Sequence, residues 1–168
     1  PRGVDAAVDV LVDPAAHADE VNLSAVARTE LAVAVGLHRL QSGAADGAVA
    51  LLEAVEAQVE GIDPNLRSAT ALAHVAVGDL DRALREADEV DAAPRATYLD
   101  RLTAGVARTL AHARRGDAAA ALASGDQLRA AADATEDRVS QALSRLVLAV
   151  AAEALGTPGA ADAAADAD

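Results

Sequence analysis

The stretch LAHVAVGDLDRALREA, residues 72–87, decides the fold of this chain. Its apolar residues recur at three- and four-residue steps on both sides of Gly78-Asp79, which is the spacing of an amphipathic helix. A glycine accepts the left-handed backbone conformation that ends a helix, and an aspartate caps the first turn of the next one. The stretch therefore predicts two helices joined by a tight turn.

Other parts of the chain align with this turn. They read LHRLQSGAADGAVALL (37–52), LAHARRGDAAAALASG (110–125) and, more weakly, VAAEALGTPGAADAAA (150–165). The turn glycines Gly43, Gly78, Gly116 and Gly156 are spaced by 35, 38 and 40 residues. A period of this length is typical of a two-helix repeat.

Helical periodicity extends over most of the chain, and no stretch alternates with period two, so we expect no sheet. Asp63-Pro64, Pro94 and Thr135 are expected to start helices. The helices are predicted near 23–42, 45–60, 64–77, 80–92, 95–115, 117–133 and 135–155. Because their connections are short, sequential helices should be antiparallel.

The ends of the chain are less regular. A further helix is expected over about 4–12, before Asp13-Pro14, and residues 157–168 could form one more short helix or fray. We therefore expect one helical-repeat domain over 1–168. It has a leading helix and connection at 1–22, a repeat core at 23–155 and a partial last repeat or frayed tail at 156–168.

Small residues flank each turn at fixed distances, seven positions before the glycine and five after it. The pairs are Gly36 and Ala48, Ala71 and Ala83, Thr109 and Ala121, and Ala149 and Ala161. In this feature the chain resembles the tetratricopeptide-repeat family. The resemblance implies an all-α array of antiparallel helix hairpins, an α-solenoid, in which each small pair is in contact. Helices cross closely only where both side chains are small.

The chain departs from that family in two ways. His74 and His112 stand four residues before their turns, where the family usually has tyrosine, so we expect both to be semi-buried fillers of an aromatic position. Two of the repeat spacings also exceed the usual length. Such longer repeats look like those in large bacterial transcriptional regulators with helical-repeat sensor regions.

Composition restricts the possible partners and location. The formal net charge is −13, and all 14 basic residues are Arg. No basic patch is segregated, so we expect no nucleic-acid partner through this domain. Arg114-Arg115 is interpreted as a favourable contact at a helix end. The chain has no Cys, no signal peptide and no apolar run near about 18 residues, so we expect a cytoplasmic protein without membrane contact.

Two further features concern the origin of the chain. The Ala, Gly, Arg, Val, Asp and Leu bias is typical of a GC-rich bacterial genome. The absence of Met suggests that the chain begins after its native start, either by processing or as part of something longer.

Motifs for chemistry are absent from the sequence. The four histidines form no HExxH or Glu-x-x-His pattern, no glycine-rich phosphate loop occurs, and no serine sits in a nucleophile elbow. One helix carries an acidic cluster that we interpret as a solvated face: Asp79, Asp81, Glu86, Asp88, Glu89 and Asp91. We therefore expect no catalytic, metal-binding or cofactor-binding residue and no enzyme activity. A helical enzyme or metal protein would need a polar constellation in a pocket.

The resemblance implies a concave surface lined by the first helix of each pair. Mapping by distance from the turn glycines predicts a partner-binding groove lined by Val33, Leu37, Leu40, Asn65, Leu72, Val75, Val106, Leu110, Arg114, Leu146 and Val150. Only Asn65 and Arg114 could help to clamp a terminal carboxylate, so we expect the groove to take an amphipathic helix instead. Alternatively, the chain's own flanking helix fills the groove, or these residues are simply core.

The leading hypothesis is a non-enzymatic protein–protein interaction scaffold that binds an apolar or helical segment of a protein or peptide. The alternative is a regulatory or sensor domain of a larger bacterial transcriptional regulator or signalling ATPase. A homo-oligomer is compatible with either.

Overall fold

The computed structural model describes Val8, Leu11, Val12 and residues 24–156, and this part of the chain is all-helical, without a strand. Its helices are α2 (Ala25–Gln41), α3 (Ala45–Glu56), α4 (Pro64–Val77), α5 (Leu80–Ala92), α6 (Tyr98–Arg115), α7 (Ala118–Asp133) and α8 (Arg138–Ala154). The predicted all-α class is confirmed. No helix among these residues is both long and apolar enough to cross a membrane.

The turns at Gly78 and Gly116 are built as the sequence predicts. Both glycines are left-handed C-caps, with φ of 91° and 76°, a conformation that costs a residue with a Cβ atom about 1–2 kcal/mol. The following Asp79 and Asp117 cap α5 and α7 by accepting hydrogen bonds from the amides of Arg82 and Ala120. Each turn therefore ends one helix and starts the next within two residues.

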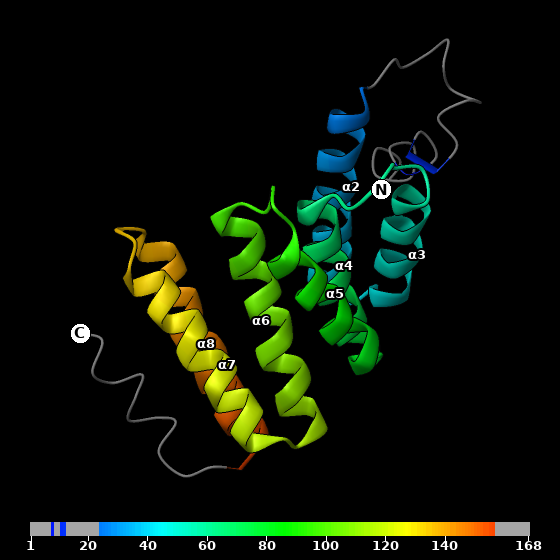
Figure 1. Ribbon diagram of the computed structural model, residues 1–168. Coiled ribbons are helices and arrows are strands. Elements are labelled where there is room, and N and C mark those ends of the chain that lie inside the picture. Colours follow the sequence, from blue (N-terminus) through cyan, green and yellow to red (C-terminus); the bar gives the residue numbers. More distant parts are fainter. Residues whose placement is uncertain (1–7, 9–10, 13–23, 157–168) are drawn as a thin grey trace.

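The helices form two layers (Figure 1). Consecutive members of the first layer, α2, α4, α6 and α8, contact one another side by side. Each second-layer helix, α3, α5 or α7, packs against the two first-layer helices that precede and follow it in the chain. Within the described residues the backbones of the second-layer helices do not come close to one another, so a gap separates α3 from α5 and another separates α5 from α7.

Small residues allow the close crossings. Gly36 is buried, and a Cβ atom there would lie 2.9 Å from Leu52 Cδ2. Ala71 and Ala83 are both fully buried and belong to one core cluster. At Thr109 the close neighbour is Gly125, whose added Cβ would lie 3.5 Å from Thr109 Cγ2.

The other members of the predicted small pairs differ in burial. Ala48 and Ala121 are fully buried, whereas Ala149 is half-buried. Its predicted partner, Ala161, lies outside the described residues, as does the whole predicted segment 157–168. Of the leading helix predicted at 4–12, only Val8, Leu11 and Val12 are described, and all three are helical.

Three predicted helix boundaries were wrong. α3 ends at Glu56 rather than near 60, because the chain tightens into i to i+3 hydrogen bonds at Gln58 and Val59. α6 starts at Tyr98 rather than at 95, because Thr97 and Asp100 form a capping box there. The cap of α8 is Asp137 rather than Thr135, whose hydroxyl instead donates to the Ala132 carbonyl at 2.7 Å.

Candidate functional site

An apolar groove crosses the first layer. Counted back from the turn glycines, the sixth residue is Leu37 in α2, Leu72 in α4, Leu110 in α6 and Val150 in α8. These equivalent side chains line one cavity of about 470 Å³. Because only first-layer helices contribute to the lining, the groove belongs to the face away from the second layer.

A second row of side chains lines the same cavity. Leu40, Val75 and Ala113 stand three residues before their turns. Among the lining residues only Gln41 and Arg114 are polar. Binding sites for apolar groups have this composition and fall in this range of volume, and the lining contains no nucleophile or acid–base pair.

Arg114 fixes the spacing of two groove helices. Its guanidinium Nη1 donates to the carbonyl oxygens of Val75 and, at 3.3 Å, Ala76. These carbonyls belong to the last turn of α4, where the Val75 carbonyl also accepts the Gly78 amide at 3.2 Å and the helix dipole favours a cation. Arg115 pairs with Asp81. Both arginines thus make helix-end or surface contacts.

The structure brings seven of the predicted groove residues together and places the others elsewhere. Val33 and Val106 are buried in core clusters. The side-chain amide of Asn65 donates to Glu30 at 3.3 Å. Leu146 is 60 % exposed and does not line the cavity. The cavity lies near the helix C-termini, so residues ten or more positions before the turn do not reach it.

The prediction missed some lining residues because they are small or polar: Gln41, Ala76, Ala113, Ala151 and Ala154. A search for large apolar residues passes over them. Their positions two, three or five residues before the turn glycines were the available signal.

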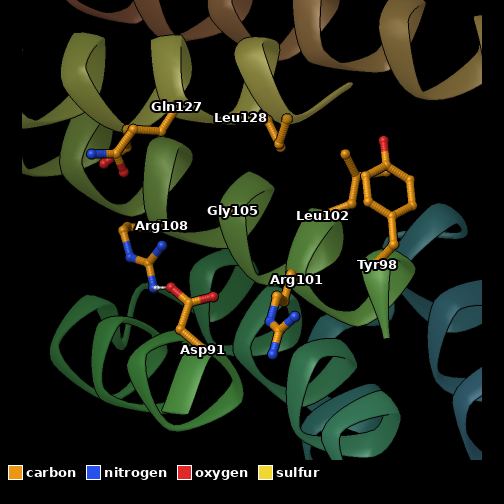
Figure 2. A pocket seen from close by; sticks show the side chains of 10 residues that line it. Asp91, Tyr98, Arg101, Leu102, Gly105, Arg108, Gln127 and Leu128 are labelled. Carbon is orange, nitrogen blue, oxygen red and sulfur yellow. Dashed lines mark hydrogen bonds and ion pairs between the residues drawn. The ribbon is translucent and has the colours of Figure 1, made fainter. Parts of the chain in front are cut away.

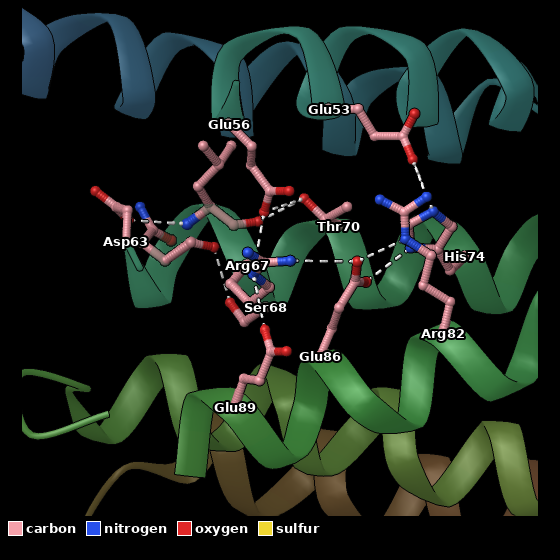
Figure 3. Close-up of polar contacts among 12 residues, drawn as sticks. Glu53, Glu56, Asp63, Arg67, Ser68, Thr70, His74, Arg82, Glu86 and Glu89 are labelled. Carbon is pink, nitrogen blue, oxygen red and sulfur yellow. Dashed lines mark hydrogen bonds and ion pairs between the residues drawn. The ribbon is translucent and has the colours of Figure 1, made fainter. Parts of the chain in front are cut away.

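A buried ionic network lies behind the groove, between α3, α4 and α5 (Figure 3). His74 is 2 % exposed, with Nδ1 2.7 Å from Glu86 Oε2 and Nε2 3.3 Å from Glu53 Oε1. Arg82 joins both carboxylates and lies 3.1 Å from Glu86 Oε1. A ring whose two nitrogens both face carboxylates can donate from both only when it is protonated.

Arg67 extends this network into the gap between α3 and α5. Its guanidinium lies 3.5 Å from Glu56, 3.5 Å from Glu86 and 3.4 Å from Glu89. The Thr70 hydroxyl donates to the same Glu56 carboxylate at 3.1 Å. The backbones of α3 and α5 lie apart, so these side chains, together with the ion pair between Arg82 and Glu53, link the two helices across the gap.

Burial and charge shift two pKa values in the network. Burial lowers the pKa of His74, but hydrogen bonding to and the charge of Glu86, with help from Glu53, more than offset it, so this pKa lies above its usual value. Burial also raises the pKa of Glu56, against the opposing charge of Arg67. Both shifts favour the protonated form in the folded protein.

Two interpretations of single residues require correction. Glu86 is not part of a solvated acidic face, because it is 2 % exposed and ion-paired. His74 is not a semi-buried filler of an aromatic position; it is buried and hydrogen-bonded. His112, at the equivalent position, is half-buried, with its Nδ1 4.0 Å from Asp117. The described residues include no group of three His, Asp or Glu side chains suited to hold a metal ion.

Comparison with family models, with curated proteins and with solved structures finds no match for this chain. The groove and the network are therefore interpreted from their own geometry and chemistry.

Proposed function

We propose that this chain is a protein–protein interaction scaffold that acts by binding, not by catalysis, and that its groove receives the apolar face of a helical segment. One observation carries the proposal. Four equivalent aliphatic side chains, on four helices that lie side by side, line one cavity.

The spacing of the groove indicates the pattern of its occupant. Packed helices lie about 8–10 Å apart, so a helix lying across the first layer meets one of these aliphatic side chains at about that interval. Two turns of an α-helix rise about 10.8 Å. The occupant should therefore present large apolar residues about seven positions apart, with others at three- or four-residue steps between them.

Charge indicates the other face of the occupant. The chain carries a formal net charge of −13, which attracts cationic partners over long range. Arg114, the one cation among the lining residues, already donates to the end of α4. We therefore propose a helix that is apolar on one face and rich in Lys or Arg on the other.

The test uses a defined peptide. An amphipathic peptide of about 18 residues, long enough at about 1.5 Å per residue to cross four helices, carries Leu on one face and Lys on the other. A control peptide has the same composition in scrambled order. Methyl NMR should show saturable shifts at Leu72, Leu110 and Val150 with the first peptide only.

Matched variants locate the binding. Leu72→Glu/Leu110→Glu should weaken binding at least about 100-fold, because an unpaired carboxylate would be buried beneath the peptide. Leu122→Glu is the control, since Leu122 lies on α7 at 39 % exposure and outside the groove. Circular dichroism checks the fold of each variant. Equal binding to the wild type and to a folded double variant would exclude the groove as the site.

A further inference from the structure

A second cavity, of about 340 Å³, occupies the gap between α5 and α7, on the other side of the first layer (Figure 2). Its walls come from the end of α5, from α6 and from the middle of α7. In this gap Arg101 and Arg108 extend from α6 toward α5, where Arg108 meets Asp91. None of its lining residues lines the groove.

The repeat explains why this gap is hollow. Arg67 stands eleven residues before Gly78, and its side chain fills the gap between α3 and α5. Gly105 stands eleven residues before Gly116 and lines the second cavity. One gap is therefore filled by a guanidinium where the other, at the same position of the repeat, has no side chain.

The surroundings of the empty position have changed as well. Counted forward from the preceding turn glycine, Glu56 corresponds to Asp91 (13 residues), Glu86 to Ser124 (8 residues) and Glu89 to Gln127 (11 residues). Asp91, Ser124 and Gln127 all line the cavity. Where the first gap has the carboxylates of Glu86 and Glu89, the second gap therefore has the hydroxyl of Ser124 and the amide of Gln127.

The remaining carboxylate of the cavity is neutralised. Arg108 Nη2 lies 2.6 Å from Asp91 Oδ2 and 3.1 Å from Asp88 Oδ1. Arg108 stands eight residues before Gly116, and Thr70 stands eight residues before Gly78. The Thr70 hydroxyl donates a hydrogen bond to Glu56 in the gap between α3 and α5. The second gap has therefore lost the excess of negative charge that surrounds Arg67.

Several hydrogen-bonding groups that line the cavity have no partner among the described residues. The Arg101 guanidinium forms no hydrogen bond or ion pair with another described residue, and the same holds for the side chains of Ser124 and Gln127. Leu102, Leu128 and the ring of Tyr98 supply apolar wall. A guanidinium without a partner among the described residues, lining the same cavity as a hydroxyl and an amide, is suited to a carboxylate.

We propose that this cavity binds a small organic anion, whose carboxylate pairs with Arg101 and whose apolar part packs against Leu102, Leu128 and Tyr98. The volume corresponds to roughly eleven water molecules at about 30 Å³ each, which suits a ligand of about ten non-hydrogen atoms. This inference is independent of the groove, which lies on the other face and has an apolar lining.

The chain carries its own reporter for the test. Tyr98 is the only aromatic residue in the sequence apart from histidine, and it lines the cavity. The tyrosine ring signals in NMR spectra therefore come from this cavity alone, and no site-specific label is needed. The probe is cyclohexanecarboxylate, and the matched control is cyclohexanecarboxamide, which has nearly the same shape without the charge.

The carboxylate should shift the Tyr98 ring signals saturably, and the carboxamide should bind at least about tenfold more weakly, as expected for loss of a charge-assisted pair. Arg101→Gln should weaken carboxylate binding about tenfold. Gln127→Glu, which restores the acid found at Glu89, should weaken it by a similar factor. Both side chains are exposed, so both variants should fold.

Arg28→Gln is the control variant, because the Arg28 side chain also has no partner among the described residues but lies on α2, away from the cavity. It should bind like the wild type. The proposal is overturned if the carboxylate causes no saturable shift, if the carboxamide binds equally well, or if Arg101→Gln binds with unchanged affinity.

Discussion

Glu86 is the residue on which the ionic network depends. Its carboxylate faces His74, Arg82 and Arg67 at 2.7, 3.1 and 3.5 Å, and its side chain is 3 % exposed. A buried charge is tolerated only when its partners balance it. Glu89, one turn further along α5, pairs with the same Arg67 but is 45 % exposed. The two glutamates therefore form a matched pair that differs mainly in burial.

Glu86→Ala should lower the free energy of unfolding by about 3–5 kcal/mol, because it removes the carboxylate that pairs with the Nδ1 atom of buried His74 and with both arginines of the network. Glu89→Ala should lower it by less than about 1 kcal/mol, as for exposed ion pairs. Urea denaturation followed by circular dichroism measures both. Similar losses for the two variants would show that Glu86 has no special role.

His74 should make stability depend on pH. Its pKa is raised in the folded protein above the usual value of 6.5, so the folded state holds the proton more tightly than the unfolded state does. The resulting stabilisation is complete below about pH 6.5 and is lost as the pH rises through the folded-state pKa. Glu56, whose pKa is also raised, acts in the same direction at lower pH.

Urea denaturation between pH 6 and pH 9 should show the wild type losing stability as the pH rises. His74→Gln should remove this contribution, because it leaves no titrating ring between Glu53 and Glu86. A decline of equal size in His74→Gln would assign the pH dependence to other groups.

The sequence contained part of the information for this network. Glu86 lies between Ala83 and Val90 on the inner side of α5, where helical spacing alone places it toward the core. Glutamate is usually exposed to solvent, and this preference led to the wrong prediction that Glu86 lies on a solvated face. Glu53 and Glu56 of α3 come close to Glu86 of α5 only because α3 and α5 both pack against α4. No local sequence pattern predicts how far apart these residues lie in the folded structure.

At the scale of elements, glycines inside helices mark where neighbouring helices approach closely. A Cβ atom at Gly125 of α7 would lie 2.2 Å from Leu148 Cδ2 of α8. At Gly47 of α3 the nearest atom to an added Cβ belongs to the Arg39 side chain, 3.6 Å away. The first glycine permits a contact between helices, whereas the second only weakens its own helix.

Gly47→Ala should therefore raise the free energy of unfolding by about 0.5–1 kcal/mol, through helix propensity alone. Gly125→Ala should fail to do so, because the gain in propensity is opposed by displacement of Leu148. Thermal or urea denaturation of the two variants tests the contrast. A similar gain at both positions would mean that α8 shifts freely away from α7.

Existence and order of the helices could be predicted because apolar spacing, glycine C-caps and aspartate N-caps agree along the chain. The boundaries of a helix could not be predicted where two nearby residues can each act as its N-cap. Near α8, Thr135 and Asp137 both carry capping side chains, and the Asp137 carboxylate receives the Val139 amide at 3.0 Å. Which of the two residues caps α8 depends on where α7 ends and on how the two helices pack, and this is a property of the tertiary structure.

At the scale of the whole molecule, the middle helices of the first layer are the most enclosed. α4 packs against α2, α3, α5 and α6, and α6 packs against α4, α5, α7 and α8. Among the described helices, α8 packs against α6 and α7 alone, and its exposed side presents Val139, Leu143, Leu146 and Val150. Stability in repeat arrays is carried by contacts between neighbours, so it should not be uniform.

Native-state hydrogen exchange should therefore be slowest in α4 and α6 and faster in α8, since local opening is easiest where fewest contacts break. Protection of α8 equal to that of α6 would contradict this expectation and show that another surface covers the exposed side of α8 in solution.

The groove could be predicted in part because the repeat places equivalent residues at one level of the first layer, as for Leu37, Leu72, Leu110 and Val150. The cavity between α5 and α7 could not be predicted, because it lies beside Gly105, where an added Cβ atom would come within 3.0 Å of Leu128, and no apolar or polar pattern in the sequence marks such a position.

The two gaps of the second layer also give the array unequal resistance to bending. Arg67 and its carboxylates brace the gap between α3 and α5, whereas the gap between α5 and α7 is hollow. Flexing should concentrate at the hollow gap, about α6 as a pivot. The groove lies on the opposite side of the first-layer helices. A rotation about α6 that brings α5 and α7 together would therefore move the groove sides of the first-layer helices apart and widen the groove.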